Sequence, residues 1–405
     1  MSSDRIARRN YGGTDTGLRT DHGVTEIRGG TVVTPEGSIE DGCILLQEGR
    51  IREVGTTIGS DAATVIDATD RIVMPGIVDL HGDDIEHHLF PRSGAHVDER
   101  LALSSADRAN VATGVTTKFH AISFEDAVEE NRTLDLAREL TRTIQETDGF
   151  LGNNRVHARC ELGCKSHAAV AEFLTDNVVD LVSLVNHVPG SGQFDDVEEF
   201  QRRYVGDRDL SSEAVEQLAE RRSTMSAHVV NDRIERIVEK AHANGIPIAS
   251  HDDETPAEVY RAAECGATIC EYPLTMAAAR RAKELGLCTV MGAPNLVRGG
   301  SLWDNLEARE AAREGVVDVL CSDYHPPSLL AAPFVETGEP LHERVARVTK
   351  NPADVVGFLR RGRLEGGARA DVLVVDPDPV PTVDHAFVGG REVFRATDQT
   401  SSLES

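Results

Sequence analysis

The middle of the chain alternates between two patterns, one polar with a helical period and one short and apolar. Five of the helical stretches end at a glycine that is followed at once by an apolar, β-branched run. Glycine commonly follows the last residue of a helix, and short apolar runs between helices are typical of buried parallel strands. The five glycines are Gly114, Gly245, Gly266, Gly286 and Gly315. Thr255, followed by Pro256, and Thr275 stand where N-caps would begin two of the helices.

Three further apolar runs, IVDLHGD, RVHARCELG and DLVSLVNHV, raise the number of predicted strands to eight, each leading into a helix. Eight such units between residues 76 and 355 predict an α/β protein with a (β/α)8 TIM-like barrel as its catalytic domain. The alternative is a doubly wound open sheet, which would commonly carry a G-x-G-x-x-G turn or a phosphate loop. The chain has neither motif, so the barrel is the favoured fold.

The segments before and after the barrel share a different pattern, in which apolar and polar residues alternate between closely spaced glycine and proline turns. This pattern, at 24–75 and again at 356–396, is typical of a small antiparallel sheet. We therefore expect one β-sandwich domain built from both terminal regions, with the barrel inserted between them. The outermost segments, 1–23 and 397–405, are polar and are expected to be flexible tails.

The charge of the chain limits its partners. Its 68 acidic residues exceed its 42 basic residues and give a net charge of −26, spread along the whole sequence, and only five of the basic residues are Lys. This composition predicts adaptation to high salt, the alternative being an ordinary acidic protein. Nucleic acids and anionic membranes are not expected as partners, because binding to them needs clustered Lys and Arg.

The expected cellular location of the protein follows from its apolar runs and its cysteines. No apolar run approaches the roughly 18 residues that a membrane span needs, and the first residues lack the apolar core of a secretory signal. The seven cysteines are odd in number and lie mostly in apolar runs, which suits reduced thiols. Cys160 and Cys164 have no second pair of matching spacing, so no structural zinc site is expected. We expect a cytoplasmic protein.

Polar residues stand where the predicted strands end, which is the end of a barrel at which active sites form. His81 and Asp83 are two positions apart, so both side chains should point to the same face of their strand and could bind one cation. The expected metal ligands are His81, Asp83, Glu161, His187, His251 and Asp323. Imidazole and carboxylate donors suit one or two divalent ions, with Zn²⁺ as the first expectation and Mn²⁺ or Fe²⁺ as alternatives.

Such a site is suited to metal-assisted hydrolysis. A bound metal ion lowers the pKa of its water toward about 7, and Asp323 is the carboxylate expected to take the proton. Asp253, expected on the same face as His251, is a second candidate for accepting a proton or for orienting a ligand.

Other residues near these strand ends are alternatives to this set. Lys118, on the same strand face as His120, is an alternative bridging ligand if its amine is carboxylated. Glu161 is preferred because it is already an acid and closes its strand at the right depth. His87 and His88 follow the first predicted metal pair and are interpreted as loop residues.

Several strings in the chain resemble the amidohydrolase superfamily over about residues 24–396. The resemblance lies in the string PGIVDLH, which ends at His81, and in the tail GGARADVLVV. The later histidines and Asp323 on the last strand complete the pattern. Longer strings, including VDLHGDDIE, HARCEL, ASHDDET, MGAPNLVRGGS and SDYHPPSLL, are similar to one branch, the α-D-ribose 1-methylphosphonate 5-triphosphate diphosphatases of the carbon–phosphorus lyase pathway.

The resemblance implies a hydrolase of phosphonate catabolism. Its substrate would be a ribose 5-triphosphate that carries an alkylphosphonate at C1, from which it would release pyrophosphate to leave the 5-phosphate. The resemblance also implies the six metal ligands named above. His-x-Asp stands on the first strand where most amidohydrolases have His-x-His, so the number of metal ions, one or two, stays open.

A triphosphate substrate needs cations against the charge that develops on its phosphoryl oxygens. The candidate substrate-binding residues are Arg92, Arg298, Gly299, Gly300, Ser301 and Lys350. The two glycines would let backbone N–H groups approach phosphate oxygens, and Ser301 would add a hydroxyl donor. Arg159, beside Glu161, is also a candidate but is expected to pair with that acid or with a neighbouring strand.

Two other functions remain as alternatives. Another amidohydrolase reaction, cleavage of a cyclic amide or deamination of a base, would use the same metal-activated water but would not need the cations around Arg298. A non-catalytic scaffold would have lost metal ligands, whereas all six candidates are present. The expected partner is therefore a small phosphorylated ribose, bound by a homo-oligomer.

Overall fold

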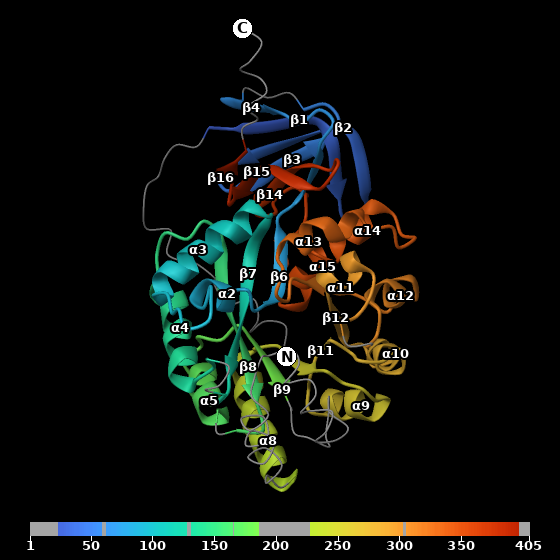
Figure 1. Cartoon of the computed structure of the whole chain (residues 1–405). Coiled ribbons are helices and arrows are strands. Elements are labelled where there is room, and N and C mark those ends of the chain that lie inside the picture. The colour runs from blue at the N-terminus through green and yellow to red at the C-terminus, as the bar shows by residue number, and fades with distance from the viewer. Residues whose placement is uncertain are drawn as a thin grey trace.

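The computed structural model describes residues 23–58, 62–127, 131–164, 166–185, 227–302 and 305–396. The two predicted tails, apart from residue 23, and the predicted ligand His187 lie outside these residues. Figure 1 shows a barrel of strands flanked by helices and, at one end of it, a sheet to which both terminal regions of the chain contribute.

The barrel contains all eight predicted strands, joined in parallel in their sequence order from the first to the last. They are β6 (Ile77–Gly82), β7 (Val115–Phe124), β8 (Asn153–Glu161), β9 (Leu181–Val185), β10 (Ile248–His251), β11 (Ile269–Glu271), β12 (Cys288–Gly292) and β13 (Val319–Cys321). The last strand meets the first through a bridge between Gly82 and Asp323. The prediction of a (β/α)8 barrel is thereby confirmed.

Helices cover the outside of the barrel (Figure 1). The helices of the described residues, including shorter ones at the barrel ends, are α2 (Ile85–Leu89), α3 (Glu99–Ala112), α4 (Leu134–Glu146), α5 (His167–Thr175), α8 (Ala227–Asn244), α9 (Pro256–Glu264), α10 (Met276–Glu284), α11 (Ala293–Arg298), α12 (Ala308–Arg313), α13 (Pro327–Ala331), the 3₁₀ turn η2 (Ala332–Phe334), α14 (Leu341–Ala346) and α15 (Lys350–Val355). Thr255 begins α9 with a capping box, and Thr275 caps α10. The five glycines predicted to end helices all have positive φ, the conformation for which glycine is favoured.

The second sheet combines strands from the two ends of the chain, as predicted. Its strands are β1 (Thr25–Thr34), β2 (Gly37–Gln47), β3 (Arg50–Gly55), β4 (Thr64–Asp67), β5 (Ile72–Pro75), β14 (Val372–Asp376), β15 (Thr382–Val388) and β16 (Arg391–Arg395). The two ends meet where β5 pairs antiparallel with β14. A sheet of this composition fits the expected β-sandwich, while the domain boundaries near residues 75 and 356 stay predictions.

Two further expectations concern the whole chain. All seven cysteines lie within the described residues and none forms a disulfide. Among the described helices, none combines the length and the apolar composition that crossing a membrane requires.

Inside the barrel, an apolar layer lies beneath a polar one. The apolar layer includes Val78, Phe119, Leu181, Ile269 and Val319, each from a different strand. Above it, toward the carboxyl ends of the strands, the interior side chains become polar. The fold therefore directs polar groups from several strands to one end of the barrel, where the candidate site lies.

Candidate active site

The first barrel strand, β6, has an irregularity that turns His81 into the barrel. Val78 and Leu80 pack in the apolar interior, so strict alternation along the strand would send His81 to the helix side. The pairing with β7 shifts register between Asp79 and Gly82, and Oδ1 of Asp79 accepts the N–H of His81 at 3.3 Å. This bulge directs His81 inward, which is a common use of bulges beside active sites.

Two donor side chains from other strands lie next to His81. The ring centroid of His81 is 5.6 Å from that of His251, at the end of β10. Its Nδ1 is 3.3 Å from Oε1 of Glu271, at the end of β11. One donor atom from each of these three residues lies within 4.8 Å of the other two. Burial lowers the pKa of His81 well below its usual value, so its imidazole is neutral and has a lone pair for a metal ion.

Two carboxyl groups face the same site from the strands that close the barrel. Asp83 follows β6, and its N–H donates to the carbonyl of Asp323, which follows β13, at 3.0 Å. Burial, reinforced by the charge of Asp83, raises the pKa of Asp323 to about 8, and burial also raises the pKa of Asp83. A divalent cation would stabilise two such carboxylates, so the donors present at this site fit a metal ion.

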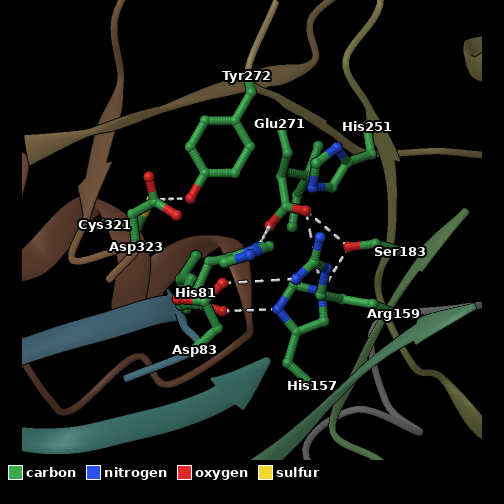
Figure 2. Close-up of polar contacts among 12 residues, drawn as sticks. His81, Asp83, His157, Arg159, Ser183, His251, Glu271, Tyr272, Cys321 and Asp323 are labelled. Atoms are coloured by element: carbon green, nitrogen blue, oxygen red, sulfur yellow. Dashed lines mark hydrogen bonds and ion pairs between the residues drawn. The ribbon is translucent and has the colours of Figure 1, made fainter. Parts of the chain in front are cut away.

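His81, Asp83, His251 and Asp323 line a cavity of about 240 Å³ at the carboxyl ends of the strands. Its ionisable lining residues are His81, Asp83, Arg132, Arg159, His251, Asp252, Arg298 and Asp323. Figure 2 shows that His81, His251, Glu271 and Asp323 converge from different strands. The cavity thus combines candidate metal ligands with three arginines.

The three arginines bring positive charge into a strongly acidic chain. Nη1 of Arg159, on β8, lies 3.6 Å from Oδ2 of Asp83, and its Nε is buried without a hydrogen-bond partner among the described residues. Arg132 forms two bonds to Glu86, from Nε at 2.8 Å and from Nη2 at 3.0 Å. Arg298, at the end of α11, donates to a nearby backbone carbonyl at 2.6 Å. Guanidinium groups in a cavity are suited to binding an anionic substrate.

The glycine loop predicted to bind phosphate follows barrel strand β12 and the short helix α11. Arg298 and Ser301 line the cavity. Gly299 ends the helix in the left-handed conformation, at φ 81°, and the N–H of Gly300 donates to the carbonyl of Asn295 at 3.3 Å. The structure therefore brings Arg298 and Ser301 to the site, and the roles of the two glycines stay predictions.

Lys350 lies at the opposite end of the barrel, which corrects its predicted position at the phosphates. Its Nζ pairs with Asp354 within α15 at 2.8 Å. The neighbouring Asn351 donates to the carbonyl of Asp318, immediately before β13 begins. Because α15 crosses the amino ends of the strands, it cannot reach the cavity at their carboxyl ends. Arg92, exposed just beyond α2, does not line the cavity either, and its role stays a prediction.

The structure also corrects the face on which Asp253 was expected. The chain turns at Asp252, which has φ 59°. As a result, Oδ2 of Asp253 accepts hydrogen bonds from Ser250 at 2.5 Å and from Cys270 at 3.3 Å. Cys270 packs between the sheet and the helices, so the Asp253 carboxylate faces away from His251. Asp252 lines the cavity instead, with Oδ2 2.9 Å from Nδ1 of His251.

Two predicted ligands are not shown at the cavity. Glu161 ends β8 two residues after Arg159, is buried at 2% exposure, and accepts the N–H of Gly163 at 2.9 Å. It does not belong to the residues that line the cavity. His187 lies outside the described residues. The roles of both as metal ligands stay predictions.

The alternative candidates, Lys118, His87 and His88, have other surroundings. Lys118 is buried on the helix side of the sheet, where its Nζ pairs with Asp79 at 2.6 Å and with Asp84 at 2.5 Å. These pairs raise the pKa of Lys118, which disfavours the neutral amine that carboxylation would need. His87 and His88, expected in a loop, belong to α2 instead, and neither lines the cavity.

Sequence reasoning undervalued Glu271 and missed Arg132. Glu271 is assigned no role from the sequence. The available signal was its position after the apolar run ATIC, in the same place as the histidines of neighbouring strands. Arg132 lies in the segment before α4. No local sequence pattern indicates that this segment returns to the cavity. Its two bonds to Glu86 on α2 are tertiary contacts that spacing cannot indicate.

Comparison with known proteins identifies the family of this chain. The α-D-ribose 1-methylphosphonate 5-triphosphate diphosphatase of Escherichia coli (strain K12) is 34% identical over 369 residues, which cover 89% of this chain and 97% of that protein. The chain belongs to this diphosphatase family of the amidohydrolase superfamily. The resemblance stated from the sequence is thus confirmed, and the chain is a hydrolase.

More distant relatives share the superfamily fold. A dihydroorotase of Pelotomaculum thermopropionicum is 23% identical over 427 residues, covering 91% of this chain and 93% of that protein. A crystal structure of an amidohydrolase is 21% identical, with a TM-score of 0.56 over 93% of this chain and 100% of its own. At this identity the structural likeness supports the fold alone. No protein-family model matches the chain.

Proposed function

We propose that the protein releases pyrophosphate from an α-D-ribose 1-alkylphosphonate 5-triphosphate and leaves the 5-phosphate, in phosphonate catabolism. The observation that carries the proposal is the 34% identity to the Escherichia coli diphosphatase, which extends over 89% of the chain. The proposal includes Zn²⁺ as the first metal to test, with Mn²⁺ or Fe²⁺ as alternatives. It also includes a cytoplasmic location and a homo-oligomeric state.

The charges of the cavity support a substrate with several phosphates. Arg132, Arg159 and Arg298 all line the cavity, whereas the whole chain carries a net charge of −26. A neutral cyclic amide would not need three guanidinium groups around it. Phosphate oxygens would each accept charge-assisted hydrogen bonds from such groups.

The chain's own residues divide the work of the proposed reaction. His81, His251, Asp83 and Asp323 would hold the metal ion. When bound, a divalent ion would supply a nucleophilic water and positive charge against the phosphate oxygens. Asp323 would accept the proton of the attacking water, and Arg159 would stabilise charge that develops on the phosphoryl group. Arg298, at the rim, would bind the phosphates farther from the metal.

Product analysis tests the proposed function. The purified protein is loaded with Zn²⁺, Mn²⁺ or Fe²⁺ and given ribose 1-methylphosphonate 5-triphosphate, and the released phosphorus species are separated. We expect pyrophosphate and the 5-phosphate in equal amounts. Release of orthophosphate, or no reaction with any of the three metals, would contradict the assignment.

The second candidate is hydrolysis of a cyclic amide. It is favoured by the match to the dihydroorotase of Pelotomaculum thermopropionicum, which is 23% identical and covers 91% of this chain. The same preparation should therefore be given dihydroorotate and a hydantoin. Turnover of either at a higher kcat/KM than the triphosphate would favour this alternative.

A further inference from the structure

Three polar side chains lie inside the barrel below the cavity, where a barrel normally has apolar residues. His157 on β8, Ser183 on β9 and Glu271 on β11 are each 0% exposed. None of the three lines the cavity itself. Burying a carboxyl group in this position is costly unless hydrogen bonds compensate for the lost water.

Polar contacts at hydrogen-bond distance join these side chains into a closed ring that begins and ends on β6 (Figure 2). Nδ1 of His157 donates to the carbonyl of Leu80 at 2.8 Å, and its Nε2 contacts the hydroxyl of Ser183. Ser183 Oγ lies 2.6 Å from Oε2 of Glu271. The other oxygen of Glu271, Oε1, lies 3.3 Å from Nδ1 of His81. Because Leu80 and His81 are consecutive residues, the contacts begin and end on either side of the same peptide bond.

We propose that Glu271 is a positioning residue for His81, and that Ser183 and His157 hold Glu271 in place. A carboxylate that accepts a proton from Nδ1 fixes the ring orientation of His81 and leaves Nε2 as the metal-binding atom. The inference rests on the proposed function in one respect only, that His81 binds a metal ion. It does not depend on the identity of the substrate.

The positions of its oxygens distinguish Glu271 from a metal ligand. Each oxygen already has a partner, His81 for Oε1 and Ser183 for Oε2. His81 and His251 line the cavity, whereas Glu271 does not. The carboxylate therefore acts on the metal site from below, through His81.

Counting protons identifies the conservative substitution. The three contacts from Leu80 through His157 and Ser183 to Glu271 need three protons, whereas a neutral imidazole and a hydroxyl supply two. In Glu271→Gln, the amide N–H would supply the third proton to Ser183. The amide oxygen would still accept from Nδ1 of His81. This variant therefore keeps the orientation of His81 while removing a carboxylate.

The test measures metal affinity in the absence of substrate. Metal-free wild type, Glu271→Ala and Glu271→Gln are titrated with Zn²⁺ against a chelating dye. We expect Glu271→Ala to bind Zn²⁺ about 10- to 100-fold more weakly, the usual cost of losing a residue behind a metal ligand. Glu271→Gln should stay close to wild type. Unchanged affinity in Glu271→Ala, or equal losses in both variants, would overturn the positioning role, the second outcome making Glu271 a ligand.

Two more variants keep the test valid if Glu271→Ala fails to fold, which thermal unfolding of the metal-free proteins would reveal. Ser183→Ala removes the partner of Oε2 and should also weaken Zn²⁺ binding; unchanged affinity would overturn the proposal. Thr289→Val is the matched control, because Thr289 is 0% exposed on barrel strand β12 and bonds to Val316, away from the ring. It should lose stability without losing metal affinity.

Failure of the inference can be told apart from failure of the proposed function. If wild type binds no divalent ion, the metal-dependent function fails. If wild type binds Zn²⁺ tightly and the Glu271 and Ser183 variants bind it equally well, only the proposed positioning role of Glu271 fails.

Discussion

The direction in which His81 points depends on a single backbone irregularity. Its spacing from Asp83 predicts that the two side chains share a face, and both do line the cavity. Alternation from Val78 and Leu80, however, would direct His81 toward the helices. The register shift after Asp79 reverses this direction. Sequence spacing can identify the pair of candidate ligands, but it cannot indicate the bulge that directs His81 inward.

His251 provides the most direct test of the metal site at the residue scale. Its ring lies 5.6 Å from that of His81 and lines the cavity. We expect His251→Ala to lose both its bound metal and its activity, because one donor of a small set is removed. Elemental analysis of the purified protein measures the metal. His342→Ala, a change on α14 away from the cavity, should retain it, and full metal content in His251→Ala would contradict the ligand assignment.

Arg298 should act on substrate binding more than on chemistry. It is exposed at the rim of the cavity, and a charge-assisted hydrogen bond to phosphate is worth about 1.5 to 3 kcal/mol. We therefore expect Arg298→Ala to raise KM for the triphosphate about tenfold or more, with a small change in kcat. Steady-state kinetics measure both values.

The control for Arg298 is Arg280→Ala on α10, where the guanidinium pairs with Glu314 outside the cavity. Its KM should match that of wild type. An unchanged KM in Arg298→Ala would remove this residue from the substrate site.

At the scale of elements, the barrel was predictable because each strand is marked locally. A glycine ends the preceding helix in five of the units, and the apolar run that follows is short enough to be a strand. What such marks cannot show is which end of the barrel a later helix crosses. Lys350 is predicted to bind phosphate, yet α15, which it begins, packs at the amino ends of the strands. Its position depends on long-range packing, which local spacing does not encode.

Buried charged residues stabilise the seam at which the first and last barrel strands, β6 and β13, meet. Lys118 on β7 pairs with Asp79 at 2.6 Å, and its Nζ lies 2.9 Å from the hydroxyl of Ser322, which follows β13. The main chain of Ser322 also donates to Asp79 at 3.0 Å. One network therefore joins three strands directly behind His81 and Asp323.

Removing Lys118 should destabilise the fold strongly. Lys118→Met would leave the buried carboxylates of Asp79 and Asp84 without their cation, which typically costs about 3 to 5 kcal/mol of the free energy of unfolding. Urea denaturation of the metal-free protein measures this loss. Lys283→Met is the matched control, because the Lys283–Asp318 pair is partly exposed and such pairs contribute about 0 to 1 kcal/mol. Equal losses in the two variants would contradict a structural role for the seam network.

At the scale of the whole molecule, the joining of the two terminal regions into one sheet was predictable from their shared pattern. The pairing of β5 with β14 brings residues about 300 positions apart into register. The charge of −26 is also a property of the whole chain, and its acids are dispersed. The cavity departs from this average, since three arginines line it. We therefore expect capture of the proposed substrate to depend on local charge, and the dispersed acids to govern the response of the chain to salt.

The acidic surface predicts that salt stabilises the fold. Raising NaCl from about 0.1 to 1 M shortens the screening length from about 10 to 3 Å, which weakens repulsion among the excess acids of the compact state. We expect Tm to rise over this range in thermal unfolding at constant pH. A variant that changes the exposed Glu36, Glu53 and Glu365 to Gln should begin with a higher Tm and gain less from salt. If Tm stays constant or falls as NaCl rises, self-repulsion does not limit the stability of this chain.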